Sequence, residues 1–172
     1  MIASSSCAQK APEPQEKAQQ STQQSPQQAA PKQEAPAYTA TNPGWMVDLD
    51  EAYAASKTSG KPIMANFTGS DWCGWCKRLT AAVFSKPEFK EWADDNVILL
   101  ELDFPRRTQI PDKYRQQNAQ LQNAFRVTGF PTIWVFNVDK DDAGKFKIDA
   151  LGKTGYAPSV NEFTSAVDAF LN

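Results

Sequence analysis

Apolar runs and helical segments alternate along this chain in an order that few folds can accommodate. Short apolar runs at 62–67 and 96–104 have the length and composition of buried strands, and helical segments separate them. Two further strands, at 131–137 and 146–152, are joined by the Asp- and Gly-rich turn 139–145. The first two strands can therefore run parallel, whereas the last two form an antiparallel hairpin. We predict an α/β fold with a central mixed sheet and helices on both faces.

Capping patterns mark the starts of several helices. In three places a residue that can cap a helix is followed three positions later by Glu, which is the spacing of a capping box. These pairs are Asp48–Glu51, Ser85–Glu88 and Ser159–Glu162. The predicted helices cover 48–59, 76–84, 87–95, 112–126 and 157–172.

The first quarter of the chain has a different composition. Residues 1–44 are rich in Gln, Pro, Ala and Ser and nearly lack large aliphatic and aromatic side chains. Such a segment buries too little apolar surface to offset the entropy lost on ordering. We therefore predict a disordered N-terminal segment at 1–44 and one folded domain at 45–172.

Charge and residue usage exclude several classes of protein. The net charge is −2, with 18 basic and 20 acidic residues and no basic stripe, so nothing indicates nucleic-acid binding. No apolar run approaches the roughly 20 residues of a membrane span. The chain has no histidine, which excludes Ser-His and Cys-His hydrolases and all His-containing metal sites. Three cysteines do not complete a closed zinc site, so we expect no metal and no cofactor.

Cys7 stands apart from the other two cysteines. Small residues precede it directly and a polar segment follows, which resembles the processing site of a bacterial lipoprotein. The leucine and the apolar core that normally precede such a site are not in the sequence. We expect Cys7 to carry a lipid anchor, with residues 8–44 as its tether; the alternative is an incidental cysteine in a flexible tail.

Cys73 and Cys76 lie two residues apart where a predicted strand gives way to a helix. A helix N-terminus offers unpaired N–H groups and a positive dipole, which stabilise a thiolate. Cys73 is therefore the predicted nucleophile, with a lowered pKa. Cys76, nearly one turn later, can form a disulfide with it and resolve a mixed disulfide. A structural disulfide and half of a metal site are the alternatives, but the strand-to-helix context favours a redox pair.

The motif "WCGWCK", residues 72–77, resembles the active site of the thioredoxin superfamily. A second stretch, "VTGFPTIWVF" at 127–136, resembles the family segment that carries a cis-proline opposite the cysteines. The resemblance covers about 45–172. The surrounding "FTGSDWCGWCKRL" and "VFSKPEF" are most similar to secreted, thioredoxin-related proteins of bacterial envelopes. The resemblance implies a thioredoxin-like three-layer fold.

The resemblance also implies roles for single residues. Pro131 would be the cis-proline, and Phe130 before it would pair its backbone with a substrate strand. Trp72 resembles the aromatic residue that packs beside the nucleophile; its alternative role is simple core packing. Lys77 adds positive charge near the cysteines. Arg106 and Arg107, after the strand ending at Asp103, are interpreted as residues of a solvated loop, with contact to a partner as the alternative.

The chain departs from the thioredoxin pattern at two places. The nearest match to the family's buried aspartate is Asn66, which cannot act as a general base; Asp71, Asp103 or water are candidates for that role. Gly74 and Trp75 stand between the cysteines in place of Gly-Pro, or of the His-containing pairs of oxidases and isomerases. The missing histidine favours a reductase over a strong oxidant.

We therefore predict a thiol–disulfide oxidoreductase of the bacterial envelope that reduces protein disulfides. Its expected partners are substrate proteins and an upstream thiol electron donor, for which the family implies a membrane thiol transporter. Two alternatives stay open. One is a disulfide oxidase or isomerase, and the other is a non-catalytic binding or chaperone module on the same fold.

Overall fold

The computed structural model describes residues 38–171. The predictions for the first 37 residues, including the lipid anchor at Cys7 and most of the disordered segment, lie outside this range. No helix within the described range is both long enough and apolar enough to cross a membrane.

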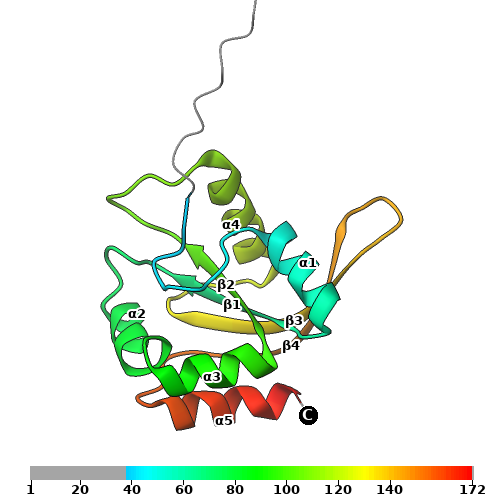
Figure 1. Cartoon of the computed structure of the whole chain (residues 1–172). Helices are drawn as coiled ribbons and strands as arrows, with labels where there is room; N and C mark the ends of the chain where they lie inside the picture. The colour runs from blue at the N-terminus through cyan, green and yellow to red at the C-terminus, as the bar shows by residue number, and fades with distance from the viewer. Residues whose placement is uncertain (1–37, 172) are drawn as a thin grey trace, which may run out of the picture. The chain divides into compact units, whose positions relative to one another are not determined.

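A mixed sheet forms the centre of the domain, as the element order predicts (Figure 1). The strands lie in the order β2-β1-β3-β4. β1 pairs with β2 in parallel, and β3 is antiparallel to both β1 and β4. The strands are β1 (Ile63–Thr68), β2 (Ile98–Asp103), β3 (Thr132–Lys140) and β4 (Phe146–Thr154).

Helices cover both faces of the sheet, so the predicted three-layer α/β fold is confirmed. α1 and α4 pack over one face, and α2, the π-helical segment η1, α3 and α5 pack over the other. The helical elements are α1 (Leu49–Ser59), α2 (Gly74–Leu79), η1 (Thr80–Phe84), α3 (Pro87–Asn96), α4 (Asp112–Ala124) and α5 (Val160–Leu171). The predicted single helix at 76–84 is therefore a short α-helix that continues into a π-helical turn.

Strand β1 divides two cores. Its odd-numbered side chains, Ile63, Ala65 and Phe67, pack with α1 and α4, and Met64 packs on the other face with α2, η1, α3 and α5. All six residues of β1 are buried. Since β1 has a strand on either side, the loop that follows it begins in the middle of the sheet, and that loop carries the cysteines.

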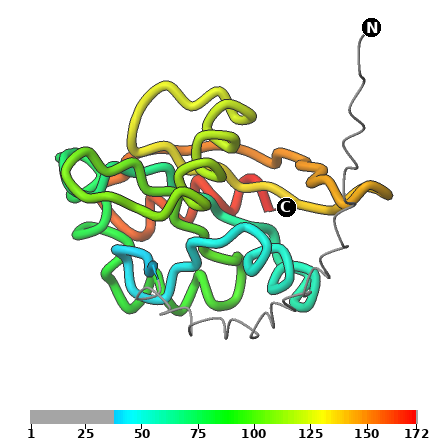
Figure 2. Tube along the Cα trace, turned by 90° about the horizontal axis from the view of Figure 1, so that it is seen from above, coloured from blue at the N-terminus to red at the C-terminus, as the bar shows by residue number. Residues whose placement is uncertain are grey.

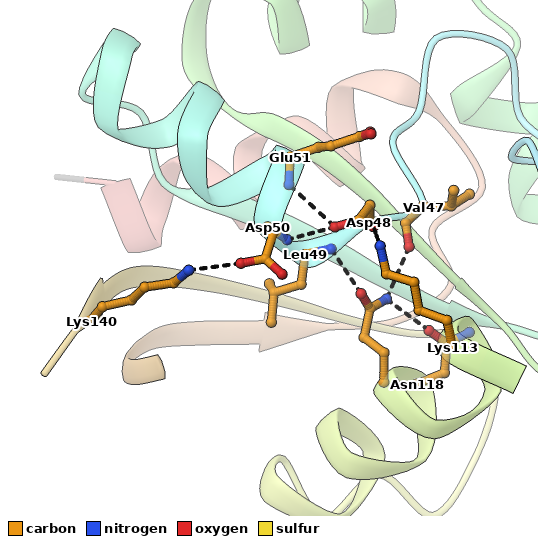
Figure 3. Close-up of polar contacts among 9 residues, drawn as sticks. Val47, Asp48, Leu49, Asp50, Glu51, Lys113, Asn118 and Lys140 are labelled. Carbon is orange, nitrogen blue, oxygen red and sulfur yellow. Dashed lines mark hydrogen bonds and ion pairs between the residues drawn. The ribbon is translucent and has the colours of Figure 1, made fainter. Parts of the chain in front are cut away.

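Asp48 caps α1, as its spacing to Glu51 predicts (Figure 3). Its Oδ1 accepts hydrogen bonds from the backbone N–H of Asp50 at 2.8 Å and of Glu51 at 3.3 Å. Lys113 of α4 forms an ion pair with the same carboxylate. The cap therefore also joins α1 to α4.

Ser159 also behaves as predicted, but Ser85 does not cap α3. The Ser159 hydroxyl accepts from the N–H of Glu162 at 3.3 Å. Lys86 is the residue before α3, and no side chain caps that helix. The Ser85 hydroxyl instead donates to the carbonyl of Ala81 at 3.3 Å, because Ser85 closes the π-helical segment.

The folded unit begins before residue 45, the predicted domain boundary. Tyr38 packs on Tyr114 with ring centroids 4.9 Å apart. Asn42 is buried and bonds to Glu101 of β2. Met46 then forms a parallel bridge with Leu100. Residues 38–44, assigned by composition to the N-terminal segment, are thus part of the domain.

Candidate active site

Cys73 and Cys76 form a disulfide at the junction of β1 and α2, with their Cα atoms 5.3 Å apart. Cys73 is the N-cap of α2, and its Sγ accepts a hydrogen bond from the backbone N–H of Cys76 at 3.1 Å. A hydrogen-bond donor and the helix N-terminus both favour negative charge at this sulfur. The two cysteines are 5% and 4% exposed, so both are buried in the disulfide form.

The Phe130–Pro131 peptide bond is cis, as the resemblance implies. It lies immediately before β3. The Phe130 ring packs against Trp72 and Phe104, with centroid separations of 5.8 and 5.2 Å. This segment is therefore joined to the cysteine loop by aromatic contact.

Trp72 is fixed from three sides. Its Nε1 donates to the carbonyl of Phe104 at 2.8 Å, and the guanidinium carbon of Arg106 lies 3.7 Å from the centre of a Trp72 ring. A Cβ atom at Gly69 would lie 2.5 Å from the Trp72 ring. The indole thus takes the space that any larger residue at Gly69 would need. Arg106, predicted to be merely solvated, covers this indole.

Trp75 lies on the surface. It is 52% exposed and Tyr156 is 41% exposed, and these two are the exposed large hydrophobic residues of the described range. Their ring centroids are 4.9 Å apart, and Arg78 lies 4.7 Å from the Trp75 ring. Gly74 begins α2 beside them, with open space where a side chain would be. An exposed aromatic surface therefore adjoins the disulfide.

Two acidic residues shape the loops around the cysteines. Asp103 is buried and accepts from the N–H and hydroxyl of Ser70 at 2.8 and 2.6 Å. Asp71 is half-buried and accepts from the backbone N–H groups of residues 106, 107 and 108. These bonds, first among them that from Arg106, lower the pKa of the Asp71 carboxyl. Lys77 donates to the Asp71 carbonyl at 3.3 Å.

Asn66 lies on the cysteine-bearing face of β1. It is 2% exposed, and its Oδ1 has no hydrogen-bond partner within residues 38–171. Its register partner on β2 is Glu101, which is 1% exposed. Glu101 accepts from the N–H of Thr41 at 2.6 Å and from the N–H and side-chain amide of Asn42 at 3.1 and 2.5 Å.

Glu101 is not among the predicted site residues. The available signal was one charged residue within the apolar strand run "NVILLELDF". Burial raises the pKa of the Glu101 carboxyl, the hydrogen bonds from residues 41 and 42 oppose this, and the charge of Asp103 adds to the rise. A small cavity of about 130 Å³ lies between this region and the cysteines, lined by Thr41, Asn42, Thr68, Ser70, Cys76, Lys77 and Thr80.

A family model described as "Thioredoxin-like" matches residues 44–137. The "Disulfide bond reductase DsbH" of Chlamydia pneumoniae is 34% identical over 110 residues, covering 64% of this chain and 66% of that protein. The "Thiol:disulfide interchange protein DsbD" of Klebsiella pneumoniae is 29% identical over 103 residues, covering 60% of this chain. The chain spans only 15% of that DsbD.

A solved structure of "DsbH Oxidoreductase" superposes with a TM-score of 0.63 at 33% sequence identity. The match covers 83% of this chain and 93% of that one. The similarity thus extends over nearly all of the described domain.

Proposed function

The chain belongs to the thioredoxin-like family of thiol–disulfide oxidoreductases, and on this premise we propose that it reduces protein disulfides in the bacterial envelope. The observation that carries the proposal is the Cys73–Cys76 disulfide at the N-terminus of α2. Both sulfurs needed for a two-electron exchange lie together there, and a backbone N–H already points at the first.

The proposed reaction starts from the reduced protein. The Cys73 thiolate attacks one sulfur of a substrate disulfide, which forms a mixed disulfide and releases the first substrate thiolate. The Cys76 thiolate then attacks the Cys73 sulfur, which restores the Cys73–Cys76 disulfide and releases the second. Two electrons pass to the substrate, and the two protons lost by Cys73 and Cys76 end on its thiols.

The remaining residues of the motif would support this exchange. Phe130 and Pro131 border the site and would hold the substrate backbone. Trp72 and Lys77 would fix the cysteine loop, through their bonds to Phe104 and Asp71. Gly74 leaves open space beside the disulfide, and exposed Trp75 would offer an apolar contact to the substrate. Asn66 would supply a buried polar group, but its amide cannot act as a general base.

Reduction is the favoured direction of exchange. No histidine is present in the chain to stabilise the thiolate further, and the similar chlamydial protein is named a disulfide bond reductase. The oxidised pair would then need two electrons from an upstream dithiol, for which a membrane thiol transporter is our proposed donor. A lipid on Cys7 would hold the domain at the envelope membrane.

Trapping the mixed disulfide tests the proposal directly. In Cys76→Ser the resolving step is blocked, so substrate proteins should accumulate as complexes on Cys73 in an envelope extract. Cys73→Ser is the matched control and should trap none. The intact protein should reduce insulin with a thiol donor, and its reduction potential should be near that of thioredoxin, about −270 mV.

Other outcomes would point elsewhere. A potential near −120 mV would favour an oxidase. Failure of both trapping and insulin reduction would favour a binding module. For the anchor, intact-mass analysis of protein from membranes should show lipid on Cys7, and an unmodified protein that retains Met1 would refute it.

A further inference from the structure

Each tryptophan of the cysteine motif is covered by an arginine. Arg106 lies over Trp72, 3.7 Å from the ring centre, and Arg78 lies over Trp75 at 4.7 Å. The two arginines come from different segments, the loop after β2 and helix α2. Trp72 directly precedes Cys73 and Trp75 directly precedes Cys76, so the two pairs flank the disulfide.

These arginines have no carboxylate partner among residues 38–171. The ion pairs of that range involve other cations, namely Lys57, Lys90, Lys113, Arg115 and Lys140. Lys77, beside the disulfide, is not in an ion pair there either. The nearby acid Asp71 directs its carboxylate to the N–H groups of residues 106–108. Three cations near the disulfide, Lys77, Arg78 and Arg106, thus have no ion pair within residues 38–171, although the whole chain has a net charge of −2.

The opposite end of the domain shows a different arrangement. The β3–β4 turn lies far from α2 in both Figure 1 and Figure 2. There Lys57 pairs with Asp139 at 3.5 Å and Lys140 pairs with Asp50 at 2.7 Å. Lys57 and Lys140 are thus neutralised within the chain, whereas Lys77, Arg78 and Arg106 near the disulfide form no ion pair within residues 38–171.

We propose that the arginine-covered tryptophans select protein disulfides whose flanking residues carry carboxylate side chains. A guanidinium that lies over an indole can still direct N–H donors outward, and a carboxylate can accept two of them. Exposed Trp75 and Tyr156 offer an apolar contact to the same segment. The expected ligand is therefore an extended, acidic stretch of a substrate protein. This inference rests on the proposed reductase function.

The test uses three peptides that share one intramolecular disulfide and differ only in two flanking residues, which are Glu, Gln or Lys. The measurement is the second-order rate constant for oxidation of the prereduced full chain, at low and at high salt. We expect the Glu peptide to react about fivefold faster than the Gln peptide, and the Lys peptide more slowly than both. The differences should shrink at high salt, because exposed charges are screened.

Variants identify the residues responsible. The double variant Arg78→Gln/Arg106→Gln should bring the Glu-to-Gln rate ratio to about one. The variant Arg78→Lys/Arg106→Lys keeps the charge and should retain part of the preference. Lys147→Gln, on the β3–β4 hairpin, removes a distant cation and should leave the ratio unchanged.

The results separate this inference from the function on which it rests. If no peptide is reduced, the reductase function itself is refuted. Equal rates for all three peptides would overturn the acidic preference and leave the reductase function standing. A preference that persists in the double glutamine variant would overturn the assignment to these arginines. The peptide series and its salt dependence need no variant, so the test does not depend on how the variants fold.

Discussion

Asp48 and Glu101 are both buried carboxylates, 3% and 1% exposed, and each accepts backbone N–H bonds from two residues. Their pKa values nevertheless shift in opposite directions. Burial raises the pKa of the Asp48 carboxyl, but the hydrogen bonds from Lys113 and from the N–H groups of residues 50 and 51 outweigh it, so that this pKa is lowered. The pKa of the Glu101 carboxyl is raised, with burial as the main cause.

The surrounding charge explains the difference. Asp48 lies at the positive end of α1 and beside a lysine, and both favour its ionised form. Glu101 has hydrogen-bond donors but no ion pair within residues 38–171, and it faces the charge of Asp103. Hydrogen bonds alone therefore do not offset the cost of burying a carboxylate here. The Asp48 carboxylate therefore stabilises the fold, whereas folding favours the protonated form of the Glu101 carboxyl.

The largest expected effect is that of Asp48→Ala. This change removes the α1 cap and the ion pair to α4, and it should lower the free energy of unfolding by about 2 kcal/mol at pH 7. Urea denaturation measures the loss. Asp50→Ala is the control, because Asp50 makes only an exposed ion pair with Lys140, and its loss should be about 0.5 kcal/mol or less. Equal losses in the two variants would contradict the role given to the cap.

A smaller effect of opposite pH dependence is expected at Glu101. A carboxyl whose pKa is raised by folding binds more protons in the folded than in the unfolded chain. The free energy of unfolding therefore falls as the pH rises from the ordinary glutamate pKa of about 4.5 through the folded pKa of Glu101. Relative to Glu101→Gln, the wild type should therefore lose stability over that window. Urea denaturation across a pH series measures the difference. A constant difference, or a relative gain by the wild type, would refute the raised pKa.

The smallest expected effect is that of Lys113→Gln. The lysine side chain is 63% exposed, so its pair with Asp48 should contribute only about 0.5–1 kcal/mol at pH 7, less in added salt. The stability that Asp48 provides is present above its unfolded pKa of about 3.8 and is lost as pH falls through the folded pKa. In the variant this acid loss should be smaller and should be complete at a higher pH, because the folded pKa of Asp48 then lies closer to its unfolded value. An unchanged acid transition would show that the N–H groups alone lower the pKa.

Much of the fold could be predicted because its signals are local. Strands β1 and β2 are short apolar runs, and the cap at Asp48 is a spacing of three residues. The start of the domain could not be predicted, because Asn42 is held by Glu101, 59 positions away in the sequence. Composition at residues 38–44 gives no sign of such a contact.

The residues of the site also divide into those with a local sequence signal and those whose contacts are long-range. Cys73, Cys76 and Pro131 lie in short motifs that can be recognised from the neighbouring residues in the sequence. Arg106 and Tyr156 cannot, because their contacts with Trp72 and Trp75 join segments that are separate in the sequence. Asn66 is the nearest match to the buried acid of the family. Glu101, a buried carboxylate, lies beside it on the adjacent strand, and this proximity follows from the strand register, which the sequence alone does not give.

Gly69 has a practical consequence for anyone who scans this domain by saturation mutagenesis. Its missing side chain leaves room for an indole that the Phe104 carbonyl and Arg106 hold in place, so Trp72 cannot easily move aside. Even alanine there should displace the indole from beside Cys73. Substitutions at position 69 would then reduce activity as strongly as substitutions at a catalytic residue, although glycine has no reactive group. A ranking of positions by loss of activity alone would wrongly assign Gly69 a catalytic role.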